Sequence, residues 1–569
     1  MTSIVLAPGG GVTSDATTGE PARQTVPRRS RRALGLGLGW AWPALLVASV
    51  YAWVGGTSLA SPDDGFILAQ SRRILSGQIP HRDFISPRPA GSALLHTVDF
   101  LLPLPLLQSS RLVSAIEVVA YTLAFARLAY RRPLRRWSTV QIAGAAAAVF
   151  VNLHSFPLMA WHTIDGLFFV AIGLVVLNRG LQSDQRRRVY FGLLLLGCAL
   201  VMKQSFAAAP VIGGAMVWMH QRDTGVRNTT VARALCVTAI PGAVYCGIVT
   251  LSGGCSAMFA QMINAQPTFG SSLVTILWRS RGATPILVAC SAVICAIEAR
   301  GGRTGAARSV ARWSARAGLS ALVLGVLLVT GTQPRGRTLL LILVVVVVWE
   351  WTSRRRVDAF GGVMIAVAWM SALSWGYPTP RLVAGSIALV IVERLWGRAP
   401  RLPKPWSTFV APGVVALAVC ASAAVCATAL NERAALNAVG SSRDATLARL
   451  VPDLRGLRVD TNTTNLIRDV ATCRARYPAR STAVLPGPAI VYPIMHLDNP
   501  FAVDWVYPLE LHGSTGRLVQ EARRLDQRGD YLVLVSPAEG VAQPLVERLV
   551  AELHGTRDQC GSFVAIHAA

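Results

Sequence analysis

Long apolar stretches of helical length recur along most of the chain and are separated by short polar segments. A helix needs about 20 predominantly apolar residues to span a bilayer, and several of these stretches are shorter, so their ends are approximate. The pattern predicts a polytopic α-helical membrane protein with about 13 transmembrane helices. The stretches lie at 34–54, 110–130, 138–153, 162–178, 189–202, 205–219, 231–251, 283–298, 317–331, 338–352, 357–373, 382–396 and 407–429.

The pattern changes near residue 431, where short helical and strand-like runs alternate up to the end of the chain. About 140 residues are enough for one folded domain. We therefore expect a disordered basic tail at 1–33, a transmembrane domain at 34–430 and an α/β domain at 431–569. In the last of these, helical patterns lie at 445–450, 465–473, 517–528 and 543–553, and apolar runs typical of buried strands lie at 481–485 and 531–535.

The distribution of charge predicts which loops face the cytoplasm. Only 15% of the 569 residues are charged and 52% are hydrophobic, yet the formal net charge is +26. Residues 431–569 contain 15 arginines and 15 acidic residues, so the whole excess lies in the membrane half. Its basic clusters fall on one side when about 13 spans are assumed, and loops rich in Lys and Arg stay cytoplasmic. We therefore expect a cytoplasmic N-terminus, an exported C-terminal domain, membrane lipids as partners and no nucleic acid.

Most of the ten cysteines lie in the apolar stretches, where cysteine behaves as a small apolar residue. Cys473 and Cys560 lie in the C-terminal domain instead. An exported domain is in an oxidising compartment, so these two form a disulfide if the fold brings them together. The sequence leaves a pair of free thiols equally open, and no Cys/His spacing indicates structural zinc.

The first exported loop, at 55–92, contains three of the few acidic residues on the exported side. Asp63 and Asp64 precede an apolar stripe of helical period that ends near Gly77, which predicts an amphipathic helix on the outer membrane surface. Two adjacent carboxylates repel each other, which raises the pKa of one of them and suits a general base. The same pair is also typical of an ordinary helix N-terminus, where acids interact favourably with the helix dipole. Spacing alone favours neither interpretation.

This loop resembles the first exported loop of the GT-C membrane glycosyltransferases, in the branch that includes the protein O-mannosyltransferases and the aminoarabinose transferase of lipid A. The many spans and the exported C-terminal domain extend the resemblance at the level of architecture. His81 stands where that family commonly has tyrosine, and the second acid of the pair is Asp64 where glutamate is common. The resemblance rests on Asp63-Asp64, the amphipathic run up to Gly77, the segment Ile79-Pro-His-Arg-Asp-Phe, Pro87 and Pro89.

The resemblance implies an enzyme of the bacterial plasma membrane that transfers a sugar, with inversion, from a polyprenyl-phosphate donor. The acceptor is a glycan, a lipid or a protein on the exported face. Asp63 is then the general base that takes the proton of the acceptor hydroxyl, with Asp64 as the second candidate. The leaving group is already a phosphate, so it needs cationic stabilisation and no strong acid.

Candidate cations for the donor phosphate are few on that face. Lys203, followed by Gln204, ends an apolar stretch, and the family often has a lysine there. The alternative is a lysine that extends its stem along lipid to reach the membrane surface. Arg82 and Arg88 share the loop with the carboxylates and can bind phosphate through two N–H groups each. Asp83, next to Arg82, completes the predicted substrate-binding set of this loop.

Polar residues near other exported span ends are further candidates. His162 and Asp165 are three residues apart and share a helix face, which fits acceptor binding, a metal site or a structural His–Asp pair. Arg381 follows a Gly/Pro-rich span end, where irregular backbone is typical of a cavity, although an interfacial anchor explains it equally well. Glu117 and Asp99 are candidates for burial inside the helix bundle, and an interfacial position is the alternative for Asp99. Whether a divalent metal is required stays open.

Two other classes of function also fit the sequence. A transporter or lipid flippase needs many spans and intramembrane acids, but it favours internal repeats, and we find none. A non-catalytic protein of cell-envelope assembly is the third class. Turnover of a lipid-linked sugar separates the enzyme from both.

Overall fold

The computed structural model describes residues 28–56, 59, 63–154, 158–225, 229–263, 282–300, 305–354, 359–373, 379–397, 404–438, 441–442, 444–511, 513–536 and 542–568. Most of the predicted N-terminal tail, residues 1–27, lies outside this part of the chain. Helix α1 begins at Arg28, within the stretch for which we expected no regular structure.

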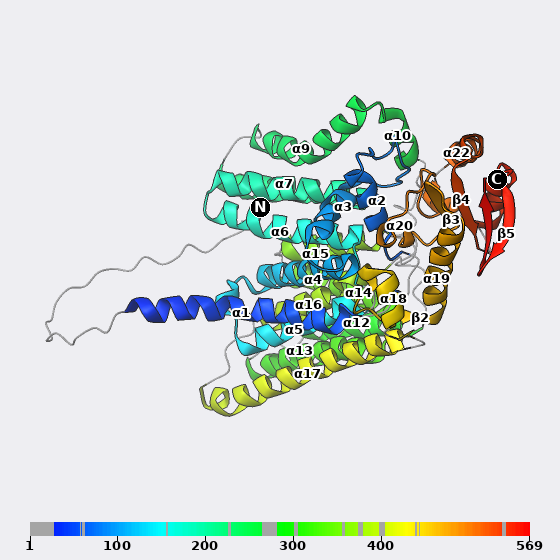
Figure 1. Cartoon of the computed structure of the whole chain (residues 1–569). Coiled ribbons are helices and arrows are strands. Elements are labelled where there is room, and N and C mark those ends of the chain that lie inside the picture. The colour runs from blue at the N-terminus through cyan, green and yellow to red at the C-terminus, as the bar shows by residue number, and fades with distance from the viewer. Residues whose placement is uncertain are drawn as a thin grey trace.

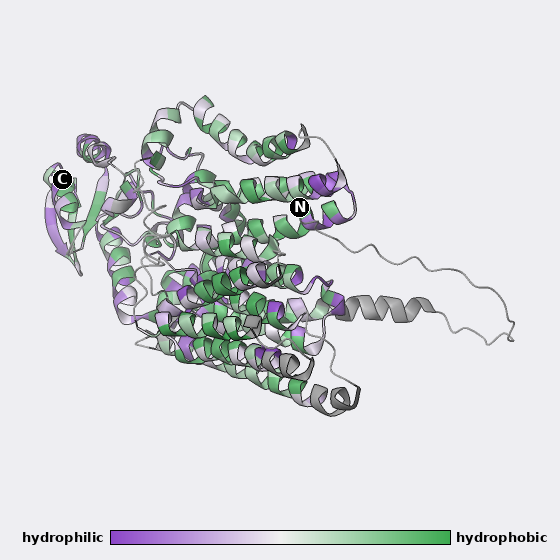
Figure 2. Ribbon diagram, turned by 180° about the vertical axis from the view of Figure 1, so that it is seen from behind, coloured by the Kyte–Doolittle hydropathy of each residue, from purple (hydrophilic) through white to green (hydrophobic). Residues whose placement is uncertain are grey.

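Apart from α10 (Cys255–Ile263), which matches no predicted stretch, the helices of the membrane part overlap the predicted apolar stretches. Figure 1 shows them packed side by side as a bundle, and Figure 2 shows apolar residues filling the middle of the bundle with polar residues toward its ends. The helices are α1 (Arg28–Val54), α4 (Leu106–Tyr130), α5 (Thr139–His154), α6 (His162–Gln182), α7 (Arg186–Met202), α8 (Ala208–Thr224), α9 (Thr229–Leu251), α10 (Cys255–Ile263), α12 (Thr284–Arg300), α13 (Gly305–Val329), α14 (Thr332–Arg354), α15 (Ala359–Ala372), α16 (Ala384–Trp396) and α17 (Lys404–Ala438).

Several helices are long and apolar enough to cross a membrane. In the part of the chain that the structure describes, five helices have this length and composition: Leu106–Tyr130, His162–Gln182, Val231–Leu251, Arg312–Val329 and Pro412–Ala435. Shorter apolar helices of the same bundle include Ala41–Val54 and Thr139–His154. The protein is therefore a multi-pass membrane protein, and the number of about 13 spans stays a prediction.

Small and polar residues allow the helices to pack closely inside the bundle. A Cβ atom on Gly385 of α16 would lie 2.2 Å from the carbonyl oxygen of Ala148 in α5, so only glycine fits there. Asn152 of α5 accepts a hydrogen bond from the Gly385 backbone N–H at 2.8 Å and donates to the Ser386 hydroxyl at 2.9 Å. These contacts join α5 to α16 without a buried polar group left unsatisfied on Asn152.

The C-terminal part forms the expected α/β domain at one end of the bundle, which we call the domain end (Figure 1). Its main sheet has the strand order β3-β4-β6-β5, with β3 and β4 parallel and the other pairs antiparallel. The two strands predicted from sequence are β3 (Ser481–Leu485) and β4 (Tyr531–Val535). The other elements include α18 (Ala445–Leu450), α19 (Thr461–Arg476), α22 (Thr515–Arg528), α23 (Gln543–Ala551), β5 (Thr556–Cys560) and β6 (Phe563–His567).

A disulfide links α19 to β5. Cys473 and Cys560 have an S–S distance of 2.17 Å and are 87 residues apart in sequence. Of the two states that the sequence left open for these cysteines, the structure shows the disulfide. Such a long-range link restricts the unfolded chain and thereby stabilises the domain.

The first loop lies between the bundle and the α/β domain and forms α2 (Phe66–Leu75), α3 (Gly91–Leu95) and η1 (His96–Leu101) (Figure 1). We expected α2 on the membrane surface, and this is wrong. Phe66, Ile67 and Leu68 are buried in one hydrophobic cluster with Leu107 of α4 and Ile490 of the domain. The apolar stripe of α2 therefore faces protein, because the helix bundle and the α/β domain both cover it.

Two adjacent arginines of α2 bind the domain rather than lipid headgroups. Arg73 is buried and forms a bidentate ion pair with Asp504, at 2.8 Å from Nε and 2.7 Å from Nη2. Arg72 is more exposed and contacts the His496 ring at 2.7 Å and Asp498 at 3.8 Å. The Arg73–Asp504 pair thus ties α2 to the domain in a water-poor environment.

Substitution of these two arginines separates the buried contact from the exposed one. Arg73→Ala leaves the Asp504 carboxylate buried without its cation, and we expect a loss of about 3–5 kcal/mol in unfolding free energy. Arg72→Ala, the matched control, removes an exposed pair worth less than about 1 kcal/mol. Thermal unfolding of the purified protein measures both. Equal losses for the two variants would contradict the proposed role of Arg73.

Candidate active site

The acidic pair forms a tight turn that directly precedes α2. Asp63, Asp64 and Gly65 make this turn, and the backbone N–H of Phe66 donates to the Asp63 carbonyl at 3.2 Å. Gly65 has φ +86°, and a Cβ atom there would lie 2.4–2.7 Å from atoms of Ile490 in the domain. Glycine is therefore required at this position, both for the backbone conformation and for the close contact.

Asp64 is a buried partner of an arginine from α4. Its Oδ2 atom lies 3.3 Å from Nη2 of Arg111, whose Nη1 atom donates to the Gly55 carbonyl at 3.0 Å. Burial raises the pKa of the Asp64 carboxyl, and the nearby Arg111 opposes this rise. Asp64 thus connects the loop to α4 and α1, a role that either interpretation of the acidic pair allows.

Lys203 lies at the domain end, between α7 and the short η3 turn (Gln204–Ala207). It is buried, and Nζ donates to the Thr163 hydroxyl at 3.1 Å. Burial, together with the nearby Arg88 guanidinium, lowers the pKa of Lys203 to about 7. Among the described residues no carboxylate forms an ion pair with Lys203. Gln204 donates to the Pro87 carbonyl at 3.0 Å, so the α7–η3 joint contacts the loop directly.

Arg88 lies next to Lys203 in a small aromatic cluster. Its two terminal nitrogens bind the Glu510 carboxylate of the domain at 2.9 and 3.0 Å. The guanidinium carbon lies 6.0 Å from the centre of the Phe66 ring, which stacks on His162 at 6.0 Å and meets Trp505 edge-on at 6.5 Å. Arg88 is balanced by Glu510, whereas Lys203 has no carboxylate partner within the part of the chain that the structure describes.

Arg82 and Asp83 bind each other and do not join this group. Their side chains form two hydrogen bonds of 2.8 Å, and Arg82 also donates to the Ser252 carbonyl at 3.3 Å. The hydrogen bonds from Arg82 lower the pKa of Asp83 below its ordinary value. The Asp83 carbonyl accepts from Arg517 of α22 at 2.7 Å. Their predicted contact with substrate stays a prediction.

His81, the departure from the family pattern, is a buried structural residue with φ +68°. Its ring lies between the Tyr245 hydroxyl at 2.6 Å and the side-chain amide oxygen of Gln261 at 3.0 Å. Burial lowers the pKa of the imidazole. The ring therefore joins the loop to α9 and α10, a contact that the sequence did not predict.

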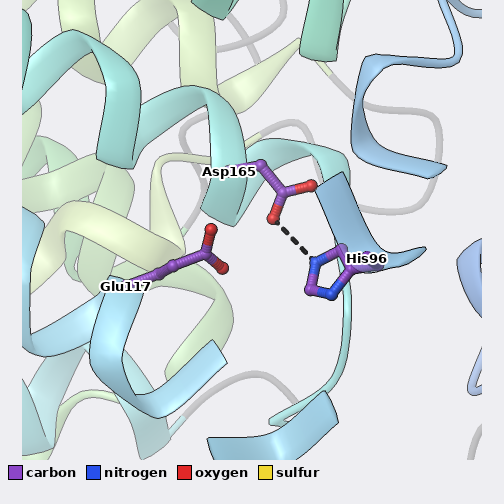
Figure 3. Close-up of side chains that lie close together, drawn as sticks. All are labelled: His96, Glu117 and Asp165. Atoms are coloured by element: carbon purple, nitrogen blue, oxygen red, sulfur yellow. Dashed lines mark hydrogen bonds and ion pairs between the residues drawn. The ribbon is translucent and has the colours of Figure 1, made fainter. Parts of the chain in front are cut away.

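His162 and Asp165 do not pair with each other, although both are buried at the start of α6. Asp165 contacts His96 of η1, with Oδ1 at 3.3 Å from Nε2. Asp99 and Glu117 are buried beside them. Figure 3 shows the Glu117 carboxylate directed toward Asp165 and His96. Four titratable groups, His96, Asp99, Glu117 and Asp165, are therefore buried together near the start of α6.

Arg381 lies in the turn η4 (Arg381–Val383), where Nε contacts the Thr379 hydroxyl at 3.3 Å. The Gly/Pro-rich segment just before it, residues 374–378, lies outside the described residues, so its predicted cavity role stays a prediction. The sequence analysis did not identify Arg111 or Tyr245. Arg111 had a usable signal, because it is a charged residue within a predicted span.

The fold defines a multi-pass helical membrane protein with a mixed α/β domain at one end of its bundle. No protein-family model matches the chain, and no curated protein matches it. Among solved structures the chain is similar to ArnT from Cupriavidus metallidurans in the apo state. The TM-score is 0.44 and the identity 10%, over 95% of this chain and 98% of that chain.

The low pKa of Lys203 leads to a direct test, because the chain has only two lysines. In protein labelled with ¹⁵N-lysine, we expect the Lys203 amine to titrate near pH 7. Added polyprenyl phosphate should raise the Lys203 midpoint, because a nearby anion favours the charged form. A Lys203 midpoint near the ordinary value of about 10.4, or no response to the lipid, would contradict the assigned environment.

Proposed function

We propose that the protein transfers a sugar from a polyprenyl-phosphate donor to a cell-envelope acceptor on the exported face of the plasma membrane. The observation that supports this most is the buried Lys203 amine, which has no carboxylate partner among the described residues. An uncompensated buried cation costs several kcal/mol, and a bound anion removes that cost. The phosphate group of the donor is an anion that can supply this counter-charge.

The surroundings of Lys203 strengthen the case for a phosphate. Helix α6 begins at His162, so the positive end of its dipole lies in the region where Lys203 contacts Thr163. Arg88 adds a second positive charge near Lys203. In the proposed complex its guanidinium interacts with both the Glu510 carboxylate and the donor phosphate. Cations and helix N-termini of this kind stabilise a developing phosphate charge.

The proposed reaction uses Asp63 as the base. The Asp63 carboxylate takes the proton of the acceptor hydroxyl while that oxygen forms a bond to the anomeric carbon from the face opposite the phosphate. The bond between the anomeric carbon and the phosphate oxygen breaks, and polyprenyl phosphate leaves as an anion beside Lys203. The configuration at the anomeric carbon is inverted. Asp64, bound to Arg111, positions the turn that presents Asp63.

The alternative functions are supported less well. A transporter or flippase must alternate its access between the two sides of the membrane, which usually requires large relative motion of its parts. Here the first loop is buried between bundle and domain, and its ion pairs to Asp504 and Glu510 connect it to the domain. A scaffold protein gives no reason for a buried lysine that lacks a counter-ion.

Turnover by the purified protein tests the proposal. Incubation with polyprenyl-phosphate hexoses and pentoses should release polyprenyl phosphate when envelope lipid and glycan acceptors are added. We expect Asp63→Asn to fold normally and to lose about 10²–10⁴-fold of the rate, which is the usual contribution of a general base.

Asp64→Asn is the matched control for Asp63→Asn. This change leaves Arg111 buried without its carboxylate, so we expect a lower unfolding temperature and less folded protein. The two acids then differ in kind: one variant is inactive and stable, the other unstable. Wild-type turnover in Asp63→Asn would show that the assigned base is wrong.

A further inference from the structure

Four titratable side chains are buried together below the proposed sugar-transfer site, and the proposed reaction uses none of them. His96 and Asp99 come from η1, Glu117 from α4 and Asp165 from α6. Their exposed fractions are 0%, 1%, 3% and 0%. Atoms of His96, Glu117 and Asp165 that can bind a metal all lie within 4.8 Å of one another. Residues far apart in sequence are thus brought to one point (Figure 3).

The hydrogen bonds of this cluster leave acceptors facing one another. His96 Nδ1 lies 2.8 Å from Asp99 Oδ2, a contact in which the ring N–H donates a hydrogen bond to the carboxylate oxygen. In the tautomer that carries its hydrogen on Nδ1, Nε2 presents a lone pair toward Asp165 Oδ1, 3.3 Å away. Among the described residues, Glu117 Oε2 and Asp165 Oδ2 have no hydrogen-bond partner. Buried acceptors in this arrangement need either protons or a metal cation between them.

We propose that His96, Glu117 and Asp165 bind a divalent transition-metal ion, Zn²⁺ or Mn²⁺. Two ligands at about 2.1 Å from one ion lie about 3.0 to 3.4 Å apart in octahedral or tetrahedral geometry. The 3.3 Å between His96 Nε2 and Asp165 Oδ1 fits this range. Glu117 supplies a third ligand from the neighbouring helix.

The donor set selects the class of ion. One imidazole nitrogen with two carboxylates suits Zn²⁺ and Mn²⁺, whereas Mg²⁺ and Ca²⁺ prefer ligands that are all oxygen. Asp99 binds the far nitrogen of His96, the second partner that metal-binding histidines usually have. Its contact fixes the ring so that Nε2 faces the two carboxylates.

The ion would join three segments that otherwise meet through side-chain packing. It links η1, α4 and α6, and its α6 ligand Asp165 is two residues from Thr163, the partner of Lys203. Its role is therefore to hold the start of α6 in place. This inference does not depend on sugar transfer, because metal content and stability report on it without any substrate.

Metal analysis of the purified protein tests the proposal. Full-length protein purified without a histidine tag, stripped with a chelator and reloaded with Zn²⁺ or Mn²⁺, should retain about one ion per chain after desalting. Its unfolding temperature should fall on stripping and recover on reloading. His96→Gln and Glu117→Gln should each lose the ion, and Asp99→Asn should weaken binding about 10–100-fold. In the Mn²⁺-loaded wild type, pulsed electron paramagnetic resonance should detect one coordinating ¹⁴N nucleus.

The matched control is Asp558→Asn, which removes the carboxylate that lies 3.0 Å from His567 in the α/β domain. It should leave the metal content unchanged. In the competing arrangement no metal is bound, His96 is protonated, and the Glu117 and Asp165 carboxyl groups share a proton. In that case wild-type protein retains no ion, and Glu117→Gln, which supplies a neutral donor of the same shape, is as stable as wild type or more so. Either result would overturn the proposal, and neither bears on sugar transfer.

Discussion

The burial of the first loop between the helix bundle and the α/β domain is the constraint on which the rest of the structure depends. The Arg73–Asp504 ion pair fixes α2 against the domain, and Gly65 allows the preceding turn to touch Ile490 directly. Phe66, which follows the acidic turn, lies beside Arg88, and Gln204 of the α7–η3 joint contacts the loop at Pro87. The domain thereby forms one wall of the candidate site, since its Glu510 binds Arg88 and its Trp505 packs against Phe66.

The sequence predicted those parts of the fold that follow directly from the surrounding lipid or from burial. A lipid environment requires long apolar helices, so the apolar stretches marked the helices of the bundle closely. Strands β3 and β4 were also evident, because both are buried apolar runs. Strand β5 was missed because its residues, Thr556–Cys560, are mostly polar and exposed. The surroundings of α2 were misread because an amphipathic stripe has the same period whether lipid or protein covers it.

The candidate site was predictable residue by residue but not in its pairings. Lys203 was notable in the sequence as one of two lysines, and the structure places it beside Arg88. His162 and Asp165 share a helix face, yet packing gives Asp165 a partner from η1 instead. Such partners are set by tertiary contacts that local spacing does not encode. The same holds for Asp64, whose Arg111 comes from the next span.

The central claim is that the buried Lys203 amine binds the phosphate of a polyprenyl lipid. The most direct measurement is a cryo-electron microscopy structure of the purified protein with polyprenyl phosphate bound. The account predicts phosphate density within hydrogen-bond distance of Lys203 Nζ, about 2.7–3.2 Å, with the Asp63 turn facing the same space. Phosphate density elsewhere, with Lys203 contacting only Thr163, would contradict it.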